Sequence, residues 1–273
     1  MERVKMVILG VFIGLGSLAS LTAQDSTAYQ LKTVIYGYFT NFTTDQLQQI
    51  YTINADNELV KYNIEGVELF RYSNNRFGKL QSVDASNPLN PLLFYPDYQL
   101  LVIVDRTLNP STQINLFELE ELVQSPVVAL GIDNQIWLYD ELNFKLKKLN
   151  QSGIITDSSE DLSLLFRGIP EIEQLDANHI YVVANAPETG LLVFDNFGQF
   201  DKEIPIRNID YFQLEGKRLF YQKEGKCFVY DFGPLAERPL KLPFYADPAD
   251  HIRVQKNYLF RLRDDRLEIY QLK

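Results

Sequence analysis

The chain has 273 residues, of which 46% are hydrophobic and 13% aromatic, so it can bury a large core and is not a disordered protein. Its 26 basic and 36 acidic residues give a formal net charge of −10, which disfavours binding to nucleic acid or to an anionic membrane surface. Sixteen Tyr and eighteen Phe against two Met and one Trp favour strands over helices.

The amino-terminal segment has the three parts of a secretory signal peptide: a basic start, an apolar run over 6–15, and a short stretch of small and polar residues. We predict a signal peptide over residues 1–24, with cleavage after Ala23 or Gln24 and export to the periplasm or cell surface. The run is too short for a span of about 20 residues, although an uncleaved anchor is an alternative. No Cys follows it that could carry a lipid, and the mature chain is expected to have no membrane-spanning segment.

Short apolar strands separated by polar turns follow one another from Tyr29 to the end of the chain. No stretch clearly sustains helical periodicity for three turns. Asn, Asp and Gly stand where tight turns require residues that tolerate positive φ. The predicted strands, in chain order, cover residues 29–36, 47–53, 58–63, 67–72, 114–117, 135–139, 144–149, 179–183, 191–195, 218–221, 227–231, 252–254, 258–262 and 266–271.

One pattern of strand, polar turn and usually a second strand recurs six times, and its spacing predicts the architecture. The anchor residues are Ile53, Val104, Tyr139, Val183, Tyr221 and Leu262, which are 51, 35, 44, 38 and 41 residues apart. A period near forty residues is typical of propeller blades built from four strands. We therefore predict an all-β fold, a six-bladed β-propeller that occupies residues 25–273 as a single domain.

The two ends of the chain are expected to meet in one blade. The last repeat is one strand short of a full blade, so the strand over 29–36 is predicted to complete it and to remove free sheet edges. Seven blades are an alternative, because the 51-residue step contains a Pro-rich insertion over 87–96 that could hold extra strands. This long step is also where we look first for function.

No motif in the chain predicts a catalytic, cofactor or metal site. His179 and His251 are isolated from each other in sequence, and no HExxH motif or Cys cluster accompanies them. Cys227 is the only Cys, so no intrachain disulfide can form, and its place in an alternating strand predicts a small buried residue. Carboxylates are frequent, as in Glu118, Glu120 and Glu121, and are expected to be solvated turn charges.

Aromatic side chains are the more suggestive feature, because Tyr and Phe are favoured anchors at protein interfaces. They gather in the Pro-rich segment and in a late loop, and packing between blades is the alternative explanation. The candidate interface residues are Leu92, Phe94, Tyr95, Tyr98, Phe244 and Tyr245.

The period and the turn residues quoted above resemble those of secreted six-bladed β-propellers of the NHL and YWTD types, over nearly the whole mature chain. The signal peptide, which ends in Thr22-Ala23-Gln24, resembles those of Bacteroidota. In that group, one periplasmic candidate that the chain resembles is the plug subunit of the type 9 secretion translocon.

The sequence favours a non-enzymatic β-propeller that binds a protein partner in the cell envelope, such as a component of an outer-membrane secretion or assembly complex. No cofactor is predicted. Two alternatives remain open: a metal-dependent hydrolase similar to lactonases, which the six-bladed architecture resembles, and a carbohydrate-binding module, since aromatic faces stack on sugars. Fold alone does not decide among them.

Overall fold

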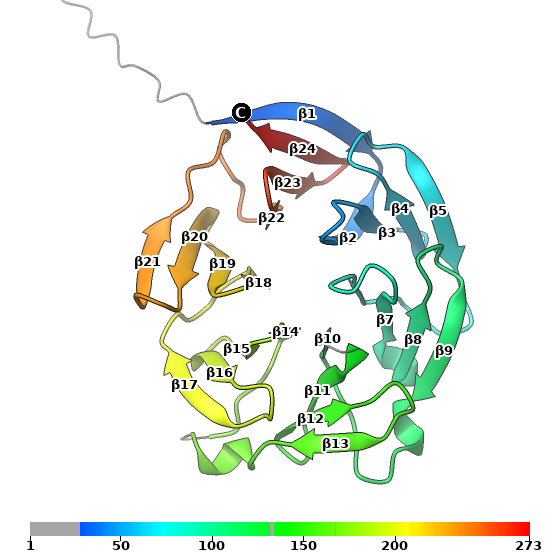
Figure 1. Cartoon of the computed structure of the whole chain (residues 1–273), viewed down its shortest axis with the longest axis vertical. Helices are drawn as coiled ribbons and strands as arrows, with labels where there is room; N and C mark the ends of the chain where they lie inside the picture. Colours follow the sequence, from blue (N-terminus) through cyan, green and yellow to red (C-terminus); the bar gives the residue numbers. More distant parts are fainter. Residues whose placement is uncertain (1–27, 132–133, 167) are drawn as a thin grey trace, which may run out of the picture.

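The computed structural model describes residues 28–131, 134–166 and 168–273, and the predicted signal peptide over 1–24 lies outside them. In the described residues the chain forms six four-stranded antiparallel sheets, which stand as blades around a central channel (Figure 1). The predicted six-bladed all-β propeller is confirmed, and the alternative of seven blades is wrong. Within the same residues, no helix is long and apolar enough to cross a membrane.

Each blade is named here from its innermost to its outermost strand. Blade 1 contains β2 (Phe39–Thr44), β3 (Ile50–Asn54), β4 (Glu58–Tyr62) and β5 (Glu68–Ser73). Blade 2 contains β6 (Ser82–Asp84), β7 (Leu92–Tyr95), β8 (Leu100–Val104) and β9 (Pro110–Asn115). Blade 3 contains β10 (Val128–Leu130), β11 (Ile136–Asp140), β12 (Lys145–Leu149) and β13 (Ile155–Ser158).

The second half of the ring repeats this order. Blade 4 contains β14 (Gln174–Ala177), β15 (Val182–Ala186), β16 (Gly190–Phe194) and β17 (Phe200–Ile204). Blade 5 contains β18 (Tyr211–Glu215), β19 (Arg218–Lys223), β20 (Lys226–Asp231) and β21 (Ala236–Pro239). Blade 6 contains β22 (His251–Gln255), β23 (Tyr258–Arg263), β24 (Arg266–Leu272) and β1 (Tyr29–Tyr36). Short 3-10 helices occupy η1 (Pro96–Tyr98), η2 (Leu116–Glu118) and η4 (Leu162–Leu164).

The amino-terminal strand closes the ring as predicted. β1 pairs antiparallel with β24, with Tyr29 opposite Leu272 and Tyr36 opposite Arg266. In Figure 1 it forms the outer edge of the blade that also holds the carboxyl terminus. The first and last strands of the chain therefore share one sheet, and the ring has no open seam.

The long step of the repeat has a simple origin in the strand assignment. Val104 lies on β8, the third strand of blade 2, whereas the other anchors lie on second strands. The second strand of blade 2 is β7, so the Pro-rich segment holds an ordinary blade strand and the turn that precedes it. The interpretation of this step as an insertion is therefore wrong, and it no longer singles out a functional region.

The core consists of apolar clusters that each join two neighbouring blades. The cluster between blades 3 and 4, for example, contains Trp137 of β11 and Phe194 of β16. Successive side chains on a strand point to opposite faces, so one strand serves two junctions. On β7, Leu92 and Phe94 face blade 3, whereas Leu93 and Tyr95 face blade 1. Burial between blades is thus what holds the ring together.

The two faces of the ring differ in their connections. We call one the loop face: it carries the connections from each outermost strand to the next blade, over 37–38, 74–81, 116–127, 159–173, 205–210 and 240–250, and the turns between second and third strands. The opposite side, called the turn face, carries the turns between first and second and between third and fourth strands. The innermost strands run from the loop face to the turn face, so a residue at the start of such a strand lies near the loop face.

Candidate functional site

The innermost strands expose one backbone edge to the channel, and polar side chains of neighbouring blades cover part of that edge. A strand edge is a row of backbone N–H and C=O groups that must find partners. Three side chains at alternate positions of blade 4 bond to alternate residues of β18 and of the turn that follows it. The contacts are Phe212 N to Gln174 Oε1 (3.2 Å), Gln174 Nε2 to Phe212 O (2.6 Å), Leu214 N to Asp176 Oδ2 (2.9 Å) and Asn178 Nδ2 to Gly216 O (2.9 Å).

The same device links blade 5 to blade 6. The Gln213 side chain accepts from Val254 N at 2.9 Å and donates to Val254 O at 2.5 Å, so one amide replaces a strand partner. Blade 6 is tied to blade 1 by Arg253, whose Nε donates to Thr44 Oγ1 at 3.1 Å. Its guanidinium also donates to the Tyr211 hydroxyl. These contacts make the channel wall a polar belt across blades 4, 5, 6 and 1.

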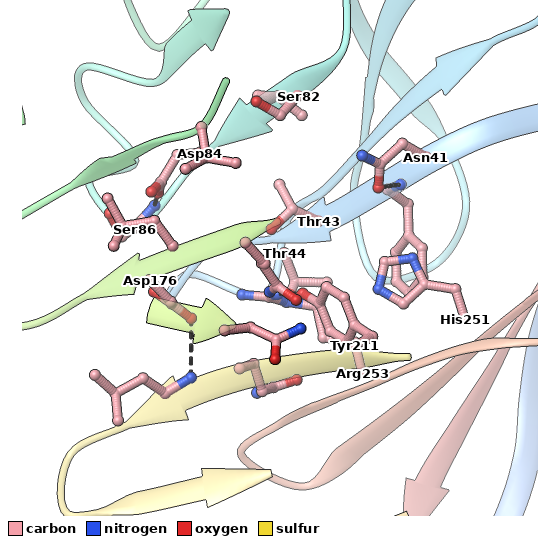
Figure 2. A pocket seen from close by; sticks show the side chains of 18 of the residues that line it. Asn41, Thr43, Thr44, Ser82, Asp84, Ser86, Asp176, Tyr211, His251 and Arg253 are labelled. Atoms are coloured by element: carbon pink, nitrogen blue, oxygen red, sulfur yellow. Dashed lines mark hydrogen bonds between the residues drawn. The ribbon is translucent and has the colours of Figure 1, made fainter. Parts of the chain in front are cut away.

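The channel contains a cavity of about 660 Å³ lined by the innermost strands (Figure 2). Among the described residues, the basic side chain in its lining is that of Arg253. The acidic side chains in the lining are those of Asp84, Glu173, Asp176, Asp210, Glu215 and Asp250. Asp250 is neutralised by Arg261, at 2.6 Å from Nη2. The remaining carboxylates outnumber Arg253, so the cavity attracts positive charge.

Asp176 is the most perturbed carboxyl group of the cavity. Desolvation and, to a smaller extent, the nearby Asp84 carboxylate together raise its pKa to about 7, against the lowering effect of Arg253. Asp84 itself accepts hydrogen bonds from Ser86 N at 2.9 Å and from Leu130 N in blade 3 at 2.7 Å. Both carboxyl groups therefore accept hydrogen bonds from the backbone of a neighbouring blade. Asp176 is partly protonated near neutral pH.

The two histidines lie at opposite ends of the innermost strands. His251 begins β22 near the loop face, whereas His179 lies in the turn between β14 and β15 on the turn face. The His251 ring lies against Tyr211 and Phe42, with ring centroids 3.9 and 4.7 Å away. Burial lowers its pKa to about 3, helped by Arg253, so the imidazole is neutral at physiological pH. The two histidines therefore lie in different parts of the molecule.

The six predicted interface residues separate into two groups. Leu92, Phe94 and Tyr95 are each 1% exposed because β7 packs between two blades, so a partner cannot reach them in this structure. The interface assignment of these three residues is corrected accordingly. Tyr98 and Tyr245 are 56% and 99% exposed and lie on the loop face.

Phe244 has an intermediate position. Its ring lies 4.1 Å from the Arg261 guanidinium and 5.0 Å from the Tyr270 ring, and it packs on the cluster between blades 5 and 6. Phe244 therefore anchors the 240–250 loop to the core between blades 5 and 6. The next residue, Tyr245, points into solvent.

Other exposed aromatic residues accompany Tyr98 and Tyr245 on the loop face. Tyr36 ends β1, Tyr38 lies in the connection from β1 to β2, and Phe117 lies in η2. Their exposed fractions are 73%, 72% and 61%. On the turn face, within the described residues, the strongly exposed aromatic side chain is that of Phe197, which is 67% exposed. One face of the ring is thus markedly richer in exposed aromatic surface.

Cys227 is buried, as predicted, in the cluster between blades 5 and 6. Burial raises the pKa of its thiol to about 12, with smaller contributions from Asp250 and Asp210. The thiol is therefore protonated at neutral pH and is a poor nucleophile.

The channel residues were missed at the level of sequence, although a local signal exists. The stretch 174–178 reads Gln-Leu-Asp-Ala-Asn, a strict polar and apolar alternation with uncharged and acidic side chains. Such a pattern predicts a strand with one polar face. It does not say that this face turns toward a channel, since that depends on the position of the strand in its blade.

The fold and the site together define a six-bladed β-propeller with an acidic polar channel and an aromatic loop face. No protein-family model matches the chain, and no curated protein matches it significantly. Solved structures do match, at low identity, and at this level they show the fold alone.

The WD40 domain of Neurospora crassa Pan2 is 9% identical to this chain, with a TM-score of 0.64 over 89% of this chain and 95% of that one. Virginiamycin B lyase of Staphylococcus aureus is 12% identical, with a TM-score of 0.58 over 85% and 80%. A catalytically inactive histidine-to-alanine variant of that lyase with quinupristin is also 12% identical, with a TM-score of 0.55 over the same shares. None of these matches supports the Bacteroidota resemblance or the one to the type 9 plug subunit.

Proposed function

We propose that the protein is a non-enzymatic, protein-binding β-propeller of the cell envelope, and that its loop face contacts the partner. The observation that carries this proposal is the concentration of exposed Tyr and Phe rings on that face. Aromatic side chains with a polar tip, such as Tyr98 and Tyr245, supply much contact area at low entropic cost. The rigid ring below them keeps the surface in one arrangement before binding.

The predicted signal peptide supports a location in the envelope, and the net charge of −10 argues against nucleic acid as the partner. A partner that complements this protein is expected to present apolar pockets bordered by basic residues. A subunit of an outer-membrane secretion or assembly complex is one protein of this kind.

An enzymatic function is the second candidate, because similar propellers include a lyase in which a histidine substitution abolishes catalysis. His251 occupies the channel of the present chain, but its pKa of about 3 makes it a weak base at neutral pH. The geometry therefore supports binding better than catalysis at this residue. A carbohydrate-binding function draws on the same exposed rings, and silence on a glycan array would count against it.

Affinity purification tests the main proposal. The tagged protein, expressed in its native cells, is recovered from detergent-solubilised envelopes, and co-purifying proteins are identified by mass spectrometry. We expect a stoichiometric partner that survives a wash at moderate salt, since apolar contacts are not screened. Recovery of the protein as a free monomer, with its pool in the cytoplasm, would contradict the proposal.

A further inference from the structure

Three buried polar atoms at the loop-face end of the channel lack hydrogen-bond partners among the described residues. They are Asn185 Oδ1, Gln222 Oε1 and His251 Nε2, and all three residues line the cavity. Asn185 is 2% exposed and Gln222 is 1% exposed. An unpaired buried oxygen costs about 1–3 kcal/mol, so such atoms usually have a partner that completes them.

These atoms belong to one continuous arc of the wall. Asn185 is opposite Gln174 in the pairing of β14 with β15, and Gln174 is bonded to the backbone of β18. Tyr211 of β18 is opposite Gln222, whose Nε2 donates to Asp250 O at 2.6 Å. His251 is the next residue. Neighbouring blades 4, 5 and 6 thus each contribute one unpartnered atom to the same end of the channel.

The arc calls for a ligand that donates hydrogen bonds and carries positive charge. The amide oxygens of Asn185 and Gln222 are acceptors, and the Nε2 donor of Gln222 is already used. Glu173 and Asp210 lie at the same end of the channel on exposed connections. The Tyr211 ring, which also lines the cavity, is an aromatic group of the kind that attracts organic cations.

A metal ion fits this arc less well than an organic cation. Across the described part of the chain, no three His, Cys, Asp or Glu side chains lie close enough to hold one. We propose that the loop-face end of the channel binds a guanidinium or alkylammonium group, whose N–H donors pair with Asn185 Oδ1 and Gln222 Oε1. The group belongs either to a free amine or to a basic side chain of a peptide. This proposal does not rest on the proposed function.

Calorimetric titration of the purified protein tests the site with three probes: agmatine, spermidine, and the blocked peptide acetyl-Gly-Arg-Gly-amide. We expect saturable one-to-one binding of at least one probe at pH 7.5. Asn185→Leu and Gln222→Met each remove one acceptor at similar volume, and each is expected to weaken binding about tenfold or more, as the loss of a hydrogen bond to a charged group does. Tighter binding of agmatine or spermidine identifies a free amine, and tighter binding of the peptide identifies a side chain.

Gln135→Met is the matched control, because Gln135 Oε1 is also buried and without a partner in the described structure but does not line the cavity. This variant is expected to bind like the wild type, and thermal unfolding confirms that all three variants are folded. Absence of saturable binding by every probe below about 10 mM would overturn the proposal. So would unchanged affinity in both cavity variants, or Ca²⁺ binding that the same two substitutions abolish.

Discussion

The loop face and the turn face are built on the same blades, yet the turn face repeats one polar turn in four blades, whereas the loop face concentrates the exposed aromatic side chains. On the turn face, an Asn or Asp that follows a third strand accepts hydrogen bonds from two backbone N–H groups of its own turn. The residues are Asn63, Asp105, Asn150 and Asp195, each bonded to the second and fourth residues that follow. On the loop face, Tyr98 and Tyr245 are mostly exposed to solvent instead.

This difference separates stability from recognition. Side chains that satisfy backbone groups contribute to folding whether or not a partner is present. Exposed rings contribute little to folding and become useful when another surface covers them. We therefore expect substitutions on the turn face to change the free energy of unfolding, and substitutions on the loop face to change binding.

The largest effect is expected on the loop face. The double variant Tyr98→Ser/Tyr245→Ser should weaken binding of the partner about 100-fold, because two aromatic anchors are removed. Its unfolding midpoint should stay unchanged, since both side chains are exposed in the free protein. Biolayer interferometry with the captured partner measures the affinity. The matched variant Ile154→Ser/Phe197→Ser, on the turn face, should bind like the wild type. Weaker binding by this variant, with normal binding by the Tyr variant, would show that the partner contacts the turn face.

The channel wall that connects the two faces should respond to pH through Asp176. Its carboxyl pKa is about 7 in the folded protein against 3.8 as the ordinary value, so the folded state binds the proton more tightly. The stabilisation is complete below about pH 4 and is lost as the pH rises through 7. Between pH 8 and pH 5 the free energy of unfolding should rise by about 3 kcal/mol.

The variant Asp176→Asn isolates this contribution, because an amide does not titrate. Urea unfolding at both pH values should show a smaller rise for the variant than for the wild type. Equal slopes in the two proteins would show that Asp176 is ionised throughout this range, and the attribution to desolvation would then fail.

On the turn face, Asp195→Ala should cost about 1–2 kcal/mol of unfolding free energy, because Phe197 N and Gln199 N both lose their acceptor. Asp201→Ala is the control in the adjacent strand, where the carboxylate is half-exposed and faces Lys202 at 3.2 Å. That variant should change stability by less than about 0.5 kcal/mol. Chemical denaturation measures the free energy of unfolding of both variants. Equal losses of stability would show that the hydrogen bonds of Asp195 to its turn do not stabilise the fold.

The smallest expected difference is the one between two variants of Leu108, which occupies a turn position that holds Gly in the three other turns of this kind. The corresponding residues are Gly66, Gly153 and Gly198, all with positive φ, and Leu108 has φ of 65° while being 2% exposed. Its apolar packing offsets the backbone strain. Leu108→Gly and Leu108→Ala should both lose stability, but the Gly variant should be more stable by about 1 kcal/mol, the reverse of the usual order. A more stable Ala variant would show that the left-handed conformation carries no strain.

Much of the architecture could be predicted because its determinants are local. The alternation of 258–262 and 266–271, with the turn between them, predicts a hairpin without knowledge of the rest of the chain, and β23 and β24 form it. Because the last repeat is one strand short of a full blade, the strand over 29–36 was predicted to complete it, and β1 does so. The anchor at Val104 shows the limit of such predictions. It was assigned to the wrong strand of its blade, because an apolar run does not reveal whether it is the second or the third strand.

The candidate site was predicted less well, because it depends on contacts between distant segments. The sequence by itself determined the strands, the turns and the ring, since side-chain period and turn chemistry act over a few residues. Only the tertiary structure decided that Phe94 is buried between blades while Tyr98, four residues later, is exposed. It alone brought Asp84, Asp176 and Arg253 to one channel, because residues far apart in the chain become neighbours only when all six innermost strands face a common axis.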